Sequence, residues 1–203
     1  MSKLKSSFLN MFLSLTIICI AAGAILTVVN NVTKDPVAAS KKAALEKAVR
    51  EVLPKYDNDP MEEAYFGVVD GDSLKIYPAK QYGILVGIAV ESYSMKGFSG
   101  EIDIIVGFDP YGKILDYSVL KHSETPGLGS KMDVWFKTDK NKQSVLGKEL
   151  SKGQLRLSKS GGEVDAITAA TISSAAFLDA INRAYAAYSG TNLDATSGAS
   201  ELH

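Results

Sequence analysis

Residues 165–174 have the sequence DAITAATISS, and the last helical pattern of the chain begins within them. From Ile172 onward, apolar residues recur at alternating steps of four, one and three, which is the apolar stripe of an amphipathic helix. The stripe consists of Ile172, Ala176, Phe177, Ala180, Ile181, Ala184, Tyr185 and Tyr188. Thr171 therefore lies at or beside the N-cap of this helix.

Two chemical roles are open to Thr171. A Thr before an apolar helical pattern commonly caps the helix, because its hydroxyl accepts a hydrogen bond from a backbone N–H group one turn later. A helix N-terminus also presents unpaired N–H groups and partial positive charge, which suit a phosphate group. Ala169 and Ala170 would let a phosphate approach the backbone closely, and the Thr171 hydroxyl could carry it covalently.

A second short stretch follows a predicted hairpin and is rich in turn formers. Its residues are Glu124, Thr125, Pro126, Gly127, Leu128 and Gly129. Pro126 stiffens the loop, while Gly127 and Gly129 permit positive φ angles and let a flat ligand lie against the backbone. By itself, such a stretch is typical of a turn that leads into a short helix, here at residues 130–136.

Together the two stretches resemble motifs of the FMN-binding domain family. The pattern Asp165-x-x-Thr168-Ala169-Ala170-Thr171-x-Ser173 is similar to the family's flavinylation motif, in which a Thr is esterified to the phosphate of FMN. Residues 124–129 resemble the loop that lies against the flavin ring. The resemblance runs from about Lys96 to Tyr188 and is strongest to the G subunits of the Rnf electron-transport complex. Many relatives have Gly where this chain has Ala169, and we expect the extra methyl group to be tolerated.

The resemblance implies a covalent flavoprotein with no catalytic side chain and no metal. FMN would be bound by a phosphoester to Thr171, and a separate flavin transferase would attach it from FAD. The further residues expected to bind the cofactor are Thr168, Ala169, Ala170, Asp165, Glu124, Thr125, Pro126, Gly127, Leu128 and Gly129. Leu128 would press on the ring. Asp165 and Thr168 would position the phosphodiester or be recognised by the transferase.

The resemblance also implies partners and a reaction. Complexes of this kind couple electron transfer between ferredoxin and NAD to the movement of Na⁺ or H⁺, and this chain would be one redox relay among neighbouring membrane subunits. One alternative is the C subunit of the Na⁺-translocating NADH:quinone reductase, which shares both motifs. Another is a flavinylated extracytoplasmic electron carrier that serves a reductase. A non-redox alternative is a membrane-tethered binding or scaffold domain in which Thr171 only caps its helix.

Composition excludes several other classes. The chain has 203 residues and a formal net charge of −1, from 22 basic and 23 acidic residues, so it has no broad basic surface for nucleic acid. Cys19 is its single cysteine, which excludes internal disulfides, Cys-based zinc sites and iron–sulfur clusters. His122 and His203 are the only histidines, so the chain has few ligands for a histidine-bound metal or haem.

The N-terminal region predicts a membrane anchor. No charged residue lies between Ser6 and Val32, and the apolar run is long enough to cross a hydrocarbon layer of about 30 Å as a helix. Lys3 and Lys5 precede the run, which places the N-terminus in the cytoplasm and the rest of the chain outside it. A cleaved signal peptide is the alternative, although its apolar region is usually only about 7–15 residues long.

The rest of the chain predicts an α+β fold: a mostly antiparallel, twisted sheet covered on one face by the first and last helices. Asp35 and Pro36 resemble the start of a helix that ends before Pro54. Strands are expected at 64–69, 73–77, 82–93, 102–108, 115–119 and 155–157. The expected units are a cytoplasmic stub with the transmembrane helix at 1–33, a linker helix at 34–60, an extracytoplasmic FMN-binding domain at 61–188 and a disordered tail at 189–203.

Several conspicuous residues have ordinary explanations. Tyr93, Phe98 and Trp135 are expected to be packing residues, since large aromatic side chains usually fill cores. His122 is expected to be a solvated loop residue. A second echo of the flavinylation motif lies at residues 194–200, but no helical pattern follows it to provide a phosphate site.

Overall fold

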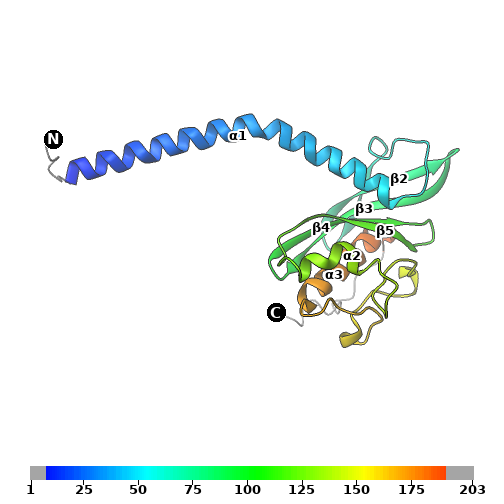
Figure 1. Ribbon diagram of the computed structural model, residues 1–203. Coiled ribbons are helices and arrows are strands. Elements are labelled where there is room, and N and C mark those ends of the chain that lie inside the picture. The colour runs from blue at the N-terminus through cyan, green and yellow to red at the C-terminus, as the bar shows by residue number, and fades with distance from the viewer. Residues whose placement is uncertain (1–7, 191–203) are drawn as a thin grey trace. The chain divides into compact units, whose positions relative to one another are not determined.

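The computed structural model describes residues 8–190. It confirms the α+β class, with an apolar N-terminal helix followed by an antiparallel sheet and further helices (Figure 1). The chain divides into two compact units, residues 1–44 and residues 45–203. The second echo of the flavinylation motif lies outside the described residues.

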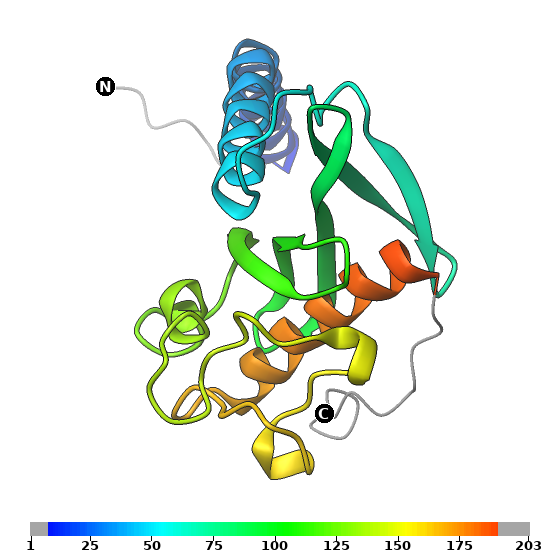
Figure 2. The ribbon, with the colours of Figure 1, turned by 90° about the vertical axis from the view of Figure 1, so that its right-hand side faces the viewer.

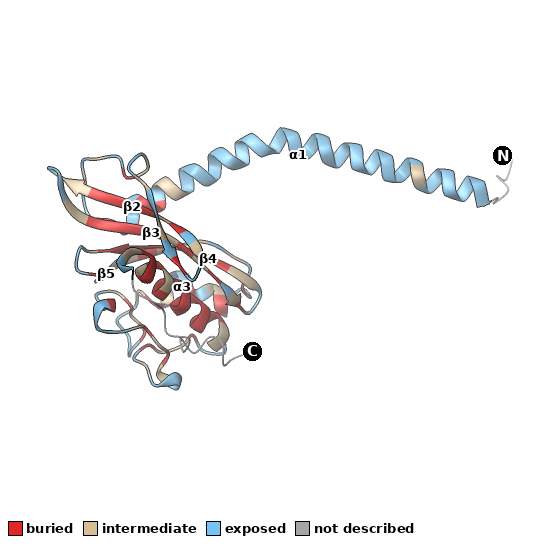
Figure 3. Ribbon diagram, turned by 180° about the vertical axis from the view of Figure 1, so that it is seen from behind, coloured by how far each residue is buried: buried red, intermediate tan, exposed pale blue. Residues whose placement is uncertain are grey.

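Helix α1 runs from Phe8 to Val52, so its 45 residues continue through Pro36 without a new start at Asp35. The expectation of a separate helix beginning there was wrong. Proline removes one helical N–H donor and disfavours a helix interior, but here it does not end the helix. α1 is long and apolar enough to cross a membrane, and its apolar side chains are exposed along residues 8–32 (Figure 3).

The sheet is a five-stranded antiparallel meander in the order β1-β2-β3-β4-β5. Its strands are β1 (Tyr65–Val69), β2 (Asp72–Gln81), β3 (Ile84–Gly97), β4 (Gly100–Phe108) and β5 (Ile114–His122). Sequence signals predicted the turns at Asp70-Gly71 and at 109–112. Tyr82-Gly83 was expected to lie within a strand, but both residues have positive φ angles and form the turn between β2 and β3.

Helix α3 (Thr171–Ser189) lies across one face of the sheet, and the loops that follow β5 gather on the same side (Figure 2). The last turns of α1 pack on the opposite face, where Ala48, Val49 and Val52 contact Tyr77 and Ile105. The neighbouring strand residues Ile76 and Ile104 point instead into the core under α3, as the alternation of a strand requires. The expectation that both helices cover one face was therefore wrong.

The segment between β5 and α3 contains only short helices. These are η1 (Gly129–Lys131), α2 (Met132–Trp135), η2 (Leu150–Lys152) and η3 (Ser158–Ser160). The strand expected at 155–157 is reduced to a single bridge between Leu157 and Val164. The amide side chain of Asn182 on α3 explains the loss, because it binds both backbone groups of Leu155, accepting from N–H and donating to C=O at 2.9 Å each.

A charged cluster fastens α3 to the turn between β1 and β2. The guanidinium of Arg183 lies 2.5 Å from the Asp72 carboxylate and stacks 5.0 Å from the centre of the Tyr93 ring, whose hydroxyl also donates to Asp72. The hydrogen bonds from Tyr93 and then Arg183 lower the pKa of Asp72.

The lowered pKa predicts a pH-dependent contribution to stability. Asp72 stabilises the fold fully above the ordinary aspartate pKa of about 3.9, and this contribution is lost as the pH falls through the lower pKa of the folded state. We expect Asp72→Asn to lose less stability between pH 7 and pH 3 than the wild-type chain does. Urea midpoints at both pH values measure this. The exposed Asp139→Asn should behave like wild type, and an equal acid loss in Asp72→Asn would contradict the assignment.

Candidate functional site

The two sequence motifs meet at one pocket of about 330 Å³. One wall is the loop after β5 and the other is the start of α3, although the two segments are more than 40 residues apart in the chain. The residues that line the pocket are Phe98, Glu124, Thr125, Leu128, Gly129, Ala169, Ala170, Thr171, Ile172 and Ser173. Seven of the eleven residues expected to bind the cofactor are therefore brought together.

Thr171 is the first residue of α3, and its side chain does not cap the helix. The residue before it, Ala170, has no side-chain oxygen, and the start of α3 shows no side-chain cap. Within residues 8–190 the Thr171 hydroxyl makes no hydrogen bond. Helical bonding begins only with the Ser174 N–H, which donates to the Ala170 carbonyl at 3.0 Å. The backbone N–H groups of residues 171–173 therefore face the pocket end of the helix without helical partners.

Ser174 fixes the turn before α3 without capping the helix N–H groups. Its hydroxyl donates to the Ala170 carbonyl at 2.8 Å and accepts the Ile167 N–H at 2.9 Å. Both bonds are buried, and they fix the turn that leads into α3. The hydroxyl of Thr171 therefore remains available for a covalent bond. It lies at a helix N-terminus, where the dipole and the N–H groups favour a phosphate.

Ala169 has a φ of +61°, in the left-handed region that disfavours residues with a Cβ atom. This conformation supplies a physical reason for glycine at this position in the similar motifs, which the sequence alone did not give. Because Ala169 is exposed, its methyl group meets no crowding, and the strain is confined to the backbone.

We expect Ala169→Gly to raise the free energy of unfolding by up to about 1 kcal/mol, because glycine adopts positive φ without a steric penalty. Ala166→Gly, three residues earlier with ordinary φ, is the matched control and should lower it by about 0.4–1 kcal/mol through the entropy of the unfolded chain. Urea unfolding followed by fluorescence of Trp135, the single Trp, gives both values. If Ala169→Gly and Ala166→Gly lowered the free energy of unfolding equally, the backbone at Ala169 would not be strained.

The loop at 124–129 is a tight turn closed on itself. The Thr125 carbonyl accepts the N–H groups of Leu128 at 3.1 Å and Ser130 at 3.4 Å. Gly127 has a φ of +74°, and its N–H donates to the Ser130 hydroxyl at 2.9 Å. Pro126 and Gly127 thus shape the loop without lining the pocket. Leu128 does line it and is 39% exposed, so an apolar surface is available to a flat ligand.

Asp165 and Thr168 do not line the pocket. The Asp165 carboxylate accepts from the Ser158 hydroxyl at 2.7 Å and from the Lys142 N–H at 3.3 Å, and the first of these bonds lowers its pKa. The Asp165 carbonyl accepts the Trp135 indole N–H at 3.1 Å. Asp165 therefore ties three loop segments together just before the turn into α3, while Thr168 is exposed beside that turn.

The structure adds three pocket residues, namely Phe98, Ile172 and Ser173. The expectation that Phe98 is a packing residue was wrong: it is 66% exposed at the turn between β3 and β4 and lines the pocket. Its setting, Gly97-Phe98-Ser99-Gly100, was the available signal, because paired glycines are typical of a turn and turns usually lie at the surface. Trp135 and Tyr93 do pack against the core, as expected.

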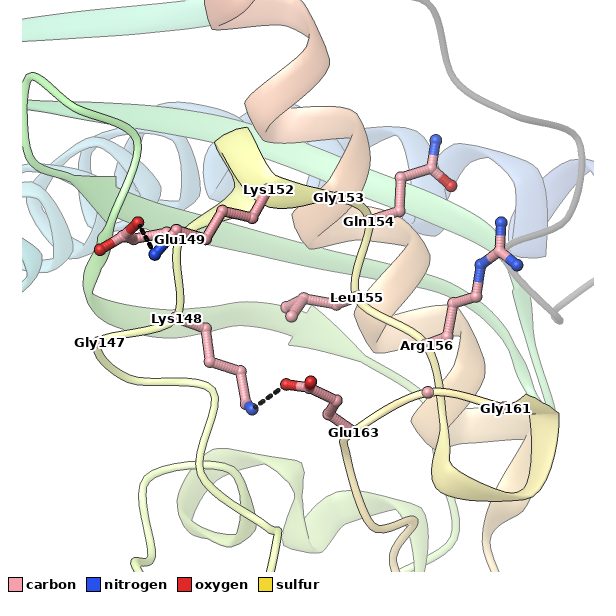
Figure 4. Close-up of a pocket in the computed structure, with 11 residues that line it drawn as sticks. Gly147, Lys148, Glu149, Lys152, Gly153, Gln154, Leu155, Arg156, Gly161 and Glu163 are labelled. Carbon is pink, nitrogen blue, oxygen red and sulfur yellow. Dashed lines mark hydrogen bonds and ion pairs between the residues drawn. The ribbon is translucent and has the colours of Figure 1, made fainter.

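A larger pocket of about 380 Å³ lies elsewhere, between residues 147–156 and 161–163 (Figure 4). It contains no motif residue. Two of its lysines already have partners, since Lys148 lies 3.3 Å from Glu163 and Lys152 lies 2.6 Å from Glu149. Volume favours this pocket, but the donor groups and apolar surface needed for a flavin phosphate and ring are at the start of α3.

The residues of the smaller pocket fit FMN. The N–H groups at the start of α3 suit its phosphate, and the exposed side chains of Leu128 and Phe98 suit an aromatic ring system. The Thr171 hydroxyl lies on the same pocket wall as those N–H groups.

Comparisons with known proteins agree with this site. The family model of the FMN-binding domain matches residues 97–186, which contain both motifs. A protein of Aliivibrio fischeri strain MJ11, named as the G subunit of an ion-translocating oxidoreductase complex, is 34% identical over 182 residues, covering 85% of this chain and 86% of that protein. Proteins of the same name from Shewanella amazonensis and Stutzerimonas stutzeri are 31% and 33% identical over 82% and 85% of this chain, and 80% and 77% of their own lengths. The chain therefore belongs to the family of G subunits of ion-translocating oxidoreductase complexes.

Proposed function

We propose that this chain is the flavin-carrying subunit of an ion-translocating oxidoreductase complex and that it binds FMN through a phosphoester to Thr171. Membership of the G-subunit family supports the role in the complex, and the match to the FMN-binding domain supports the cofactor. The single observation that carries the attachment site is the unbonded Thr171 hydroxyl, at the start of α3 and facing the loop at 124–129.

The attachment is a transfer reaction. The Thr171 oxygen forms a bond to the FMN phosphorus of FAD, the bond between the two phosphates of FAD breaks, AMP leaves and the hydroxyl proton passes to the leaving phosphate. Among the described residues that line the pocket, Glu124 is the only acid–base group, and both of its oxygens accept hydrogen bonds, from Ser99 and Ser173. A separate flavin transferase therefore supplies the catalysis.

Each part of the pocket then has a role once FMN is attached. The N–H groups of residues 171–173 would hold the phosphate, and Leu128 and Phe98 would contact the ring. The bound flavin supplies reversible one- and two-electron transfer. The covalent bond keeps it from diffusing away, so the chain relays electrons between ferredoxin and NAD through neighbouring subunits.

We place the domain outside the cytoplasm. The apolar part of α1 spans the inner membrane with Lys3 and Lys5 on the cytoplasmic side, and the chain continues into the compact unit that begins at Leu45. The tail expected at 189–203 lies almost entirely outside the described residues. Residues 6–32 contain no charged side chain to form an ion path, so Na⁺ or H⁺ movement belongs to partner subunits.

The full-length chain, produced in membranes with and without an active flavin transferase, tests this function. Intact mass should rise by one FMN less water only when the transferase is present, and the purified chain should show flavin absorbance. A folded chain that gains no mass, beside a control substrate that does, would contradict the proposal and favour the binding or scaffold alternative.

A further inference from the structure

A buried carboxylate joins three segments behind the pocket. Glu124 is 4% exposed and lines the pocket. One of its oxygens accepts the Ser99 N–H at 3.0 Å, from the turn between β3 and β4. The other accepts the Ser173 hydroxyl at 2.5 Å, from the first turn of α3. The side chain thus links the loop, the hairpin and the acceptor helix at one point.

Two glycines make room for this carboxylate. A Cβ atom on Gly97 would lie 2.2 Å from the Gly100 carbonyl oxygen and 2.7 Å from Oε1 of Glu124. A Cβ atom on Gly129 would lie 2.6 Å from the Ser173 hydroxyl oxygen and 2.8 Å from Oε2 of Glu124. Gly129 therefore serves close approach, in contrast to Gly127, which serves its positive φ.

The carboxylate also places charge at the pocket. Among the described residues, no lysine, arginine or histidine forms an ion pair with Glu124, and its oxygens are bound by neutral donors. A charge in such a buried position acts more strongly on its surroundings than a solvated one does. Since reduced flavin carries negative charge at neutral pH, a carboxylate on the pocket wall disfavours reduction.

We propose that Glu124 is a positioning residue that holds the first turn of α3 through Ser173 and, by its charge, lowers the reduction potential of the flavin. This inference rests on the proposed function, because it needs FMN in this pocket. It goes beyond that function because it names one carboxylate that lowers the reduction potential. It also distinguishes the effect of the carboxylate's charge from the effect of its hydrogen bond to Ser173.

Three variants of the full-length chain separate the two effects. Glu124→Gln removes the charge and keeps the shape, Glu124→Asp keeps the charge on a shorter side chain, and Ser173→Ala removes the hydrogen bond while leaving the charge. Each is produced with the transferase for redox titration of the flavin, and without it for urea unfolding. Glu124→Ala, Ser173→Ala and the double variant Glu124→Ala/Ser173→Ala form a double-mutant cycle, because Ala, unlike Gln, cannot accept the Ser173 hydroxyl.

We expect the midpoint potential of Glu124→Gln to move to a more positive value, while Ser173→Ala shows no positive shift and Glu124→Asp stays closer to wild type than Glu124→Gln does. In the chain without flavin, the double variant should lose less stability than the sum of the two single losses, because the side chains share one hydrogen bond. The potential is measured on the flavinylated fraction of each variant, since each retains the acceptor Thr171.

Unchanged potential in Glu124→Gln, or an equal positive shift in Ser173→Ala, would overturn the role of the charge. Strict additivity in the unfolding cycle would overturn the positioning role. If Glu124→Gln unfolds, Ser173→Ala still decides, because a positive shift in that variant, which keeps the charge, overturns the role of the charge. Failure of the proposed function would look different, since the wild-type chain itself would then gain no FMN.

Discussion

Replacing Thr171 with Ala is expected to abolish covalent attachment of FMN completely, because no other hydroxyl stands free at the start of α3. The Ser173 and Ser174 hydroxyls are both committed, to Glu124 and to the Ala170 carbonyl. The fold should be almost unaffected. The Thr171 hydroxyl makes no capping bond, and Ala is at least as good a helix former, so we expect a change in stability below about 0.5 kcal/mol.

Thr168→Ala is the matched control. Thr168 lies in the same motif and is exposed, but it does not line the pocket, so its loss should leave FMN attached. Intact mass after production with the transferase measures both variants. A Thr171→Ala chain that retains covalent FMN would move the acceptor away from Thr171. A Thr168→Ala chain that loses FMN would give Thr168 a role in attachment or in recognition by the transferase.

The second large effect concerns the packing that holds α3 in place. Phe177 is completely buried, stacks on Phe136 with ring centres 4.5 Å apart, and meets the edge of Tyr117 at 4.8 Å. We expect Phe177→Ala to cost about 3–5 kcal/mol of unfolding free energy, through lost transfer energy and the cavity left behind. This is a large share of the about 5–15 kcal/mol that stabilises a typical domain.

Because Phe177 lies six residues after Thr171 on the same helix, the loss should also reduce FMN attachment at temperatures near unfolding. Urea denaturation at 25 °C gives the free energy, and Val134→Ala serves as the control, since Val134 is exposed on α2 and should change stability little. A Phe177→Ala chain as stable as the Val134→Ala chain would show that the aromatic cluster does not hold α3.

Local patterns predicted most of the secondary structure. The alternation of 102–108 and 115–119, with a turn at 109–112, is local information and gave β4, β5 and their connection. The stripe from Ile172 to Tyr188 likewise predicted α3. Where a distant group replaces a strand partner, local patterns fail. Leu155 lies outside any sheet because the Asn182 amide, 27 residues later, binds its backbone.

In the candidate site too, the sequence predicted the local motifs but not the contacts between distant residues. Resemblance to a family motif singled out Thr171 and the loop at 124–129, and the structure brings them to one pocket. The roles within the motifs depend on contacts that spacing cannot show. In the sequence, Ser173 is only one position of the motif around Thr171. Its hydrogen bond to Glu124, 49 residues away in the chain, is found only in the structure. Asp165 likewise appears as a ligand candidate, but its bonds to Ser158 and Lys142 hold the preceding loops.

The central claim is that FMN is joined to Thr171, and tandem mass spectrometry of the transferase-treated chain tests it most directly. Trypsin cleavage after Lys159 and Arg183 yields one peptide, residues 160–183, that contains both Thr168 and Thr171. Fragment ions should place a mass of one FMN less water on Thr171. An adduct on Thr168, on Ser173 or in the tail at Thr196 would contradict the assignment.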